Sequence, residues 1–93
     1  MGKHSEPVGD TPKKMLAYYL AGRICVVGNE YPLAMDYFQR VRDIASETDE
    51  KSDYMTQYRT HSQMAEIYHN QHLYQKSYDE CMEASQIAYN NQD

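Results

Sequence analysis

The chain contains no tryptophan, one phenylalanine and two cysteines among its 93 residues. Neither Cys25 nor Cys81 belongs to a C-x-x-C motif, and their spacing matches no known disulfide framework. One disulfide between them is compatible with the sequence, but two free thiols packed on helices fit the spacing better. The N-terminal segment is polar and lacks the apolar core of an export signal. We therefore expect a cytoplasmic protein.

Long apolar runs and basic clusters are also missing. No run reaches the ~18 apolar residues that a membrane span needs. Nine basic residues stand against fourteen acidic ones, which gives a net charge of −5, and no basic cluster extends beyond Lys13 and Lys14. Nucleic-acid affinity depends mainly on neutralising phosphates. The composition therefore argues against nucleic acid and against an anionic membrane surface as partners.

No stretch alternates apolar and polar positions with the β-branched residues that are typical of strands. Apolar residues instead recur every three or four positions in four segments, which predicts helices. These segments lie at about 13–27, 32–47, 53–69 and 73–90. We expect an all-α fold with a flexible N-terminal tail at 1–11 and one helical domain at 12–93.

The first predicted helix carries a candidate buried stripe whose members are three or four residues apart: Leu16, Leu20, Ile24 and Val27. In the segment "GNEYP" that follows, Gly28 is expected to take the left-handed conformation that ends a helix, and Pro32 to begin the next helix. Most of the ten tyrosines are expected at helix–helix contacts. Tyr19 is expected to be exposed, as a contact residue for a partner.

The two halves of the sequence match when one is shifted by 43 residues. Identical pairs then coincide, among them Ile24 with Ile67, Tyr31 with Tyr74, Asp36 with Asp79, Ile44 with Ile87 and Ala45 with Ala88. Small residues also coincide, Gly22 with Ala65 and Ala34 with Ser77. Because these matches agree with the positions of the helices and turns, we predict an internal repeat. We also predict the closest helix crossings at Gly22 and Ala65.

This pattern resembles the tetratricopeptide repeat (TPR), in which small residues at positions eight and twenty let two antiparallel helices cross closely. Counted from Met15, the seven signature positions hold Tyr18, Ala21, Gly22, Cys25, Ala34, Phe38 and Val41. Counted from Tyr58, they hold His61, Met64, Ala65, Tyr68, Ser77, Cys81 and Ala84. The resemblance covers Met15 to about Asn91. It departs from the family at Cys25 and Cys81, where aromatic residues are usual, and no proline closes either repeat.

The resemblance implies two antiparallel helix pairs stacked as a short TPR-like right-handed solenoid, with repeat one at about 12–48 and repeat two at about 53–91. The period of 43 exceeds the 34 residues of a TPR, so each helix is about one turn longer. Such lengthened repeats are similar to the TPR regions of bacterial sensor and regulator proteins. The segment "AYYLAGRICVVGNEYPLAMDYFQRV" is similar to that pattern.

The resemblance also implies a non-catalytic scaffold that binds a protein or peptide on a concave face, lined by the first helix of each pair. Carried onto this chain, the groove residues are Leu16, Tyr19, Arg23, Val26, Val27, Arg59, Ser62, Glu66, His69 and Asn70. Two alternatives stay open. One is a self-associating structural fragment, and the other is a peptide-sensing region of a larger bacterial regulator.

Patterns for metal binding and catalysis are weak. His69 and His72 are three residues apart and suggest two zinc ligands, with Asp79 or Cys81 as a third, but the matching half has no histidines. Cys81 and Cys25 are expected in helix interfaces, where a thiol is inert. No Gly-rich phosphate loop and no G-x-S-x-G motif occurs. We expect no metal, no cofactor and no enzymatic activity.

Self-association of the chain is expected. An array of stacked repeats normally needs about three repeats and a polar capping helix, and this sequence has two repeats. The last helix leaves one stripe to meet water or a second copy. We expect this stripe to form a symmetric homodimer interface: Tyr78, Met82, Ser85 and Tyr89.

Overall fold

In a computed structural model, the described residues, 10–47 and 54–91, form four helices. They are α1 (Asp10–Val27), α2 (Tyr31–Glu47), α3 (Tyr54–Asn70) and α4 (Tyr74–Asn90). These two ranges contain no strand, so the predicted all-α class is confirmed. The predicted helix bounds are close, except that α1 begins at Asp10, inside the segment assigned to the tail. Residues 1–9 and the predicted charged turn at 48–53 lie outside the described residues.

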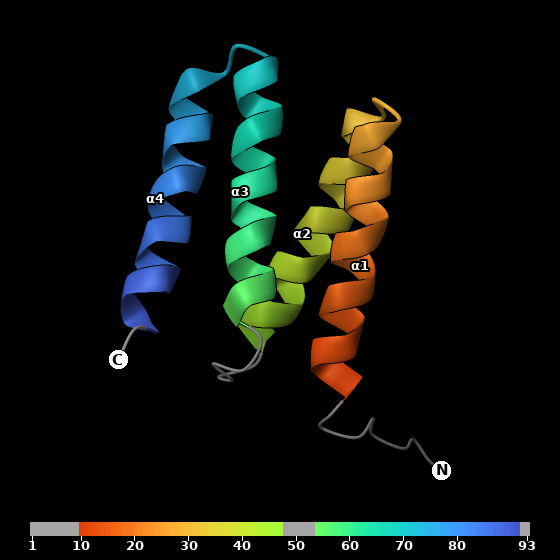
Figure 1. The fold of residues 1–93 in the computed structure, drawn as a ribbon, viewed down its shortest axis with the longest axis vertical. Coiled ribbons are helices and arrows are strands. Elements are labelled where there is room, and N and C mark those ends of the chain that lie inside the picture. Colours follow the sequence, from red (N-terminus) through yellow and green to blue (C-terminus); the bar gives the residue numbers. More distant parts are fainter. Residues whose placement is uncertain (1–9, 48–53, 92–93) are drawn as a thin grey trace.

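The helices form two antiparallel pairs, α1 with α2 and α3 with α4 (Figure 1). α3 lies between α4 on one side and the first pair on the other, and its backbone is close to all three other helices. The backbone of α4 is close to α3 alone among the described helices. α1 and α4 are therefore the two outermost helices in this view. Within the described ranges, no helix combines the length and the apolar character needed to cross a membrane.

The turn after α1 and the turn after α3 have the same backbone hydrogen bonds. After α1, the amide of Glu30 donates to the carbonyl oxygen of Cys25 at 2.8 Å, and the amide of Asn29 donates to that of Val26 at 3.0 Å. This pair of bonds is the Schellman motif, which ends many α-helices. The turn after α3 repeats both bonds 43 residues later, at the same distances. The two turns are thus alike in their backbone at the predicted shift of 43 residues.

The left-handed residue of each turn is not a glycine. Asn29 has φ 62° and its equivalent His72 has φ 65°, whereas no glycine among the described residues has a positive φ. The prediction for Gly28 is therefore wrong by one residue. The two hydrogen bonds place the left-handed position one residue after Gly28, and asparagine tolerates that conformation better than most residues.

The apolar core lies where α1, α2 and α3 meet. Its buried members are Met15, Tyr19, Ala34, Phe38, Val41, Met64 and Ile67. The ring of Phe38 lies directly against Gly22, and a Cβ atom added to this glycine would collide with the ring. The predicted close crossing at Gly22 is confirmed, because only a residue without a side chain leaves room for the ring.

The second helix pair crosses over small side chains. Ala65 and Ala84 are buried, and the hydroxyl of Ser77 on α4 donates to the carbonyl oxygen of Ala65 on α3 at 2.8 Å. A short side chain reaches a neighbouring helix carbonyl only where the two backbones approach closely. The predicted crossing at Ala65 is therefore confirmed.

The stripe of α1 that was predicted to be buried is exposed along its whole length: Leu16, Leu20, Ile24 and Val27. We refer to these four residues as the α1 stripe. The opposite face of α1 carries Met15, Tyr19 and Gly22, and this face packs on α2 and α3. The close approach of Phe38 to Gly22 determines which face of α1 packs on the core, and the α1 stripe is left on the surface.

Candidate functional site

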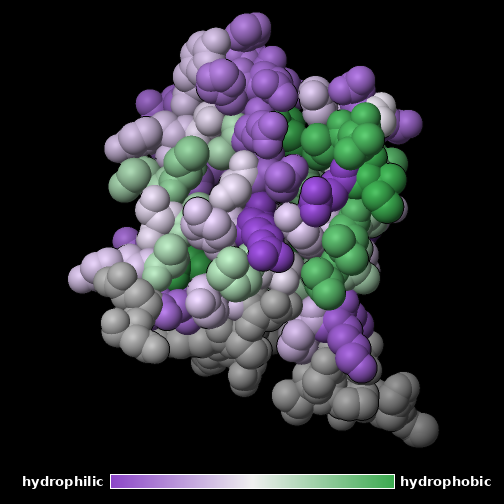
Figure 2. Space-filling model, in the orientation of Figure 1, coloured by the Kyte–Doolittle hydropathy of each residue, from purple (hydrophilic) through white to green (hydrophobic). Residues whose placement is uncertain are grey.

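The α1 stripe is a continuous apolar surface. Its members follow one another at intervals of four, four and three residues, so they share one face of the helix. Ile24 is 72% exposed and Val27 is 82% exposed. Figure 2 shows hydrophobic side chains gathered along the flank where α1 lies. Apolar surfaces of this kind on folded proteins mark interaction sites.

The structure places most of the predicted groove residues on the surface. Seven are exposed, namely Leu16, Arg23, Val27, Arg59, Glu66, His69 and Asn70. Val26 and Ser62 are half-buried. α1 and α3, which carry these residues, are neighbours in the fold. Exposure makes these residues accessible to a partner, and their part in binding stays a prediction.

Tyr19 is the exception among them. It is 5% exposed, so the prediction that it is an exposed contact residue is wrong. Its ring centroid lies 6.2 Å from that of Phe38 in the core. The guanidinium carbon of Arg23 lies 5.9 Å from the centroid of the Tyr19 ring. Tyr19 therefore packs α1 onto the core. Arg23, which lies over the Tyr19 ring, is the exposed charged residue at this position.

The outer face of α4 is the second exposed surface. Tyr78, Met82, Ser85 and Tyr89, which we refer to as the α4 stripe, are all exposed, as predicted. Cys81 is also exposed, so its predicted place in a helix interface is wrong. The face of α4 that meets α3 is narrow and is formed by the part-buried or buried residues Ser77, Glu80, Ala84 and Ile87. Cys81 lies just beside this face.

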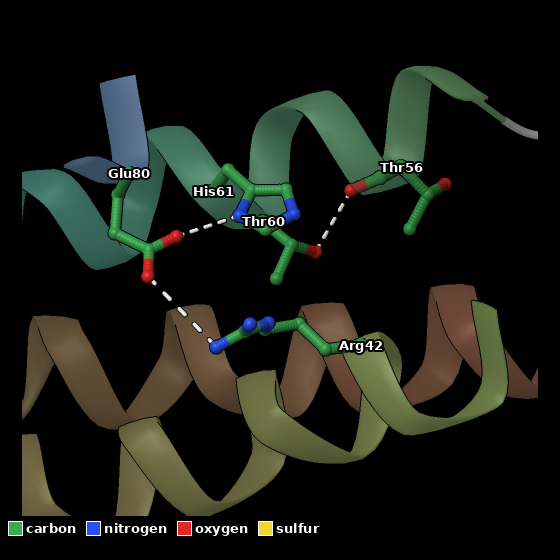
Figure 3. A network of polar contacts seen from close by, with 5 residues as sticks. All are labelled: Arg42, Thr56, Thr60, His61 and Glu80. Carbon is green, nitrogen blue, oxygen red and sulfur yellow. Dashed lines mark hydrogen bonds and ion pairs between the residues drawn. The ribbon is translucent and has the colours of Figure 1, made fainter. Parts of the chain in front are cut away.

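A buried polar network joins α3 to α4 and reaches α2 (Figure 3). Nδ1 of His61 lies 2.6 Å from Oε1 of Glu80, and both side chains are about nine-tenths buried. Nη1 of Arg42 on α2 lies 3.9 Å from the other carboxylate oxygen. His61 is therefore buried against α4. Glu80 was not predicted, because nothing in its own helix distinguishes it from the exposed acids nearby.

An open cavity of about 280 Å³ lies beside this network, at the junction of α2, α3 and α4. Its lining mixes the polar side chains of Arg42, His61 and Glu83 with apolar Val41 and Ile87. Thr60 also lines it, but its hydroxyl donates to the carbonyl oxygen of Thr56 at 2.8 Å. That hydroxyl is held by its own helix. The cavity is therefore lined by polar groups that hold helices in place.

The two histidines of the turn after α3 lie against an aromatic ring. Nδ1 of His72 is 2.8 Å from the hydroxyl oxygen of Tyr74, and the His69 ring lies edge-on to the same tyrosine at 5.3 Å between centroids. Among residues 10–47 and 54–91, no three His, Cys, Asp or Glu side chains are grouped so that they could hold a metal ion. The geometry thus gives these histidines a packing role in the turn.

Comparison with known proteins adds no relative. No protein-family model matches the chain, and no similar protein was found among the curated proteins or among the solved structures. The similarity to tetratricopeptide repeats therefore rests on the residues of this chain. Its function is argued below from the exposed surfaces.

Proposed function

We propose that the chain is a non-catalytic module that binds a protein or peptide through the outer surface of α1. The observation that carries the proposal is the α1 stripe, where four aliphatic side chains stand exposed along one face of a helix. Burying such side chains against a partner is favourable by about 1.5–3 kcal/mol for each one that becomes fully buried. Contact with water does not stabilise these side chains to a comparable degree.

The charges around the stripe indicate the chemistry of the partner. Every charged residue of α1 after Asp10 is basic: Lys13, Lys14 and Arg23. A complementary segment therefore has apolar residues at helical spacing with acidic residues beside them. Neighbouring α3 carries exposed Arg59 and Glu66, two polar residues of the mixed groove expected from the sequence.

A random-peptide display library is a direct probe of this binding surface. We expect selected peptides to be apolar and acidic, and their amide NMR footprint to fall on α1 and α3. Leu16→Glu should weaken binding by about tenfold or more, because about 1.4 kcal/mol corresponds to a factor of ten. Leu73→Glu is the matched control, since Leu73 and Leu16 are 42% and 43% exposed and Leu73 lies in the distant turn before α4.

Two results would contradict the proposal. One is a set of selected peptides that bind the Leu16→Glu and Leu73→Glu variants equally well. The other is a footprint confined to the cavity between α2, α3 and α4, which would assign binding to that cavity instead.

A further inference from the structure

The two repeats differ in what covers equivalent positions. Ile24 on α1 and Ile67 on α3 are the same residue at positions 43 apart, yet Ile24 is 72% exposed and Ile67 is 1% exposed. α3 is covered because α1 and α2 pack against it from the preceding repeat. No described helix precedes α1, so Ile24 lacks the cover that Ile67 has, whereas Arg59 and Asn70, the equivalents of Leu16 and Val27, are exposed on α3 as well.

The internal junction shows which surface covers such a face. On α2, Met35 packs against the apolar core, while Arg42 and Ser46 line the junction with α3 and α4. The positions 43 residues later on α4 are Tyr78, Ser85 and Tyr89, which belong to the α4 stripe. Two positions that α2 turns toward the next repeat, Arg42 and Ser46, therefore correspond to exposed positions on α4.

We infer that the α4 stripe of one copy of this chain covers the α1 stripe of a second copy, in a head-to-tail contact. The inference rests on the proposed binding function of α1 and names its partner as this chain itself. It replaces the symmetric α4–α4 dimer expected from the sequence with a contact between two different surfaces. Both stripes extend over twelve residues, so their first and last Cα atoms are about 16 Å apart along the helix.

Composition and charge favour this pairing over the two symmetric ones. The α4 stripe supplies two tyrosines and a methionine, which are enriched at interfaces, and the α1 stripe supplies aliphatic side chains. The exposed charged residues of α4 are two acids, Asp79 and Glu83, and one base, Lys76, whereas Lys13 and Arg23 accompany the α1 stripe. An α1–α1 contact brings basic residues together. The head-to-tail contact joins two surfaces of opposite net charge.

A head-to-tail contact does not close on itself unless the rotation between copies closes a ring. α1 and α4 are the outermost helices in Figure 1, so each added copy leaves one stripe of each kind open at the two ends. A single helix-to-helix contact is at the small end of specific interfaces, below about 1,200 Å². We therefore expect weak association, with chains that lengthen from micromolar to near-millimolar concentration.

Two blocked variants separate the alternatives in analytical ultracentrifugation. The first, Leu20→Glu with Ile24→Glu, removes the α1 surface and keeps the α4 surface. The second, Tyr78→Glu with Met82→Glu, removes the α4 surface and keeps the α1 surface. All four positions are exposed, so both variants should keep the far-UV circular dichroism spectrum of the parent chain. Leu73→Glu serves as the control that should associate like the parent.

We expect the parent chain to form species that grow with concentration. Each blocked variant alone should be a monomer at every concentration. An equal mixture of the two variants should form a heterodimer and nothing larger, because one intact α1 stripe meets one intact α4 stripe and both ends are then closed.

Other outcomes would overturn the inference. A parent chain that stays monomeric near millimolar concentration would show that the copies do not bind one another. If the α4-blocked variant alone still forms dimers, the contact is α1–α1; if the α1-blocked variant does, it is α4–α4. Peptide binding that is lost on Leu16→Glu would uphold the proposed function of α1 in each of these cases, so the two claims can fail separately.

Discussion

The two helix pairs share one backbone pattern but bury different chemistry. The first pair buries Phe38 at its centre, and the ring fills the space over Gly22. In the second pair the equivalent of Phe38 is Cys81, which is exposed, and the buried positions include His61 and Glu80. The two pairs therefore share the geometry of their turns and helix crossings. They differ in the interactions that hold the two helices of each pair together.

The difference follows from the place of each pair in the fold. α3 receives most of its apolar cover from the first pair, through Met64 and Ile67. α4 then needs only a narrow contact with α3, which small residues and one polar pair provide. The second pair should therefore depend more on polar contacts, and the first pair more on the volume of its core. The predictions below test this contrast.

The largest expected effect is at the matched positions Phe38 and Cys81. Phe38→Ala empties the centre of the core and should lower the free energy of unfolding by about 3–5 kcal/mol. Cys81→Ala changes an exposed side chain and should stay within about 0.5 kcal/mol of the parent. Urea unfolding followed by circular dichroism measures both. Similar losses for the two variants would show that the second pair also packs around this position.

A smaller effect is expected for the polar pair of the second repeat. Glu80→Ala leaves the buried imidazole of His61 without its carboxylate partner and should cost about 1.5–3 kcal/mol of stability. Glu83→Ala makes the same change of charge at an exposed acid of the same helix, and should change stability by less than about 0.5 kcal/mol.

A double-mutant cycle isolates this interaction. His61→Ala and Glu80→Ala together should cost less than the sum of the single changes, with a coupling of about 0.5–3 kcal/mol. Strict additivity of the two losses, or an equal loss in Glu83→Ala, would mean that the network in Figure 3 does not hold α4 on α3.

The helices and their turns could be predicted from the sequence, because apolar spacing and the break at "GNEYP" are local signals. The repeat also emerged from the sequence, since identical residues recur at a fixed shift. The error at Asn29 was small and arose because glycine is the usual residue at a left-handed helix end. Such features depend on residues that are close together in the chain.

The orientation of α1 could not be predicted in this way. α1 has apolar residues on both faces, with the α1 stripe on one and Met15, Tyr19 and Val26 on the other. Periodicity alone cannot choose between two apolar faces. The contact of Phe38 with Gly22 makes the choice, and that contact joins two helices. The His61–Glu80 pair was missed for the same reason, since its partners are 19 residues apart.

The central claim is that α1 presents Ile24 to a partner, at the position where α3 buries Ile67 within the chain. The most direct test is the free energy of unfolding of Ile24→Ala and Ile67→Ala at low micromolar concentration. We predict a loss of about 2–5 kcal/mol for Ile67→Ala and a change within about 0.5 kcal/mol for Ile24→Ala. At near-millimolar concentration the parent should become more stable than Ile24→Ala, because association stabilises the folded state. Equal losses at low concentration, or no separation at high concentration, would contradict the claim.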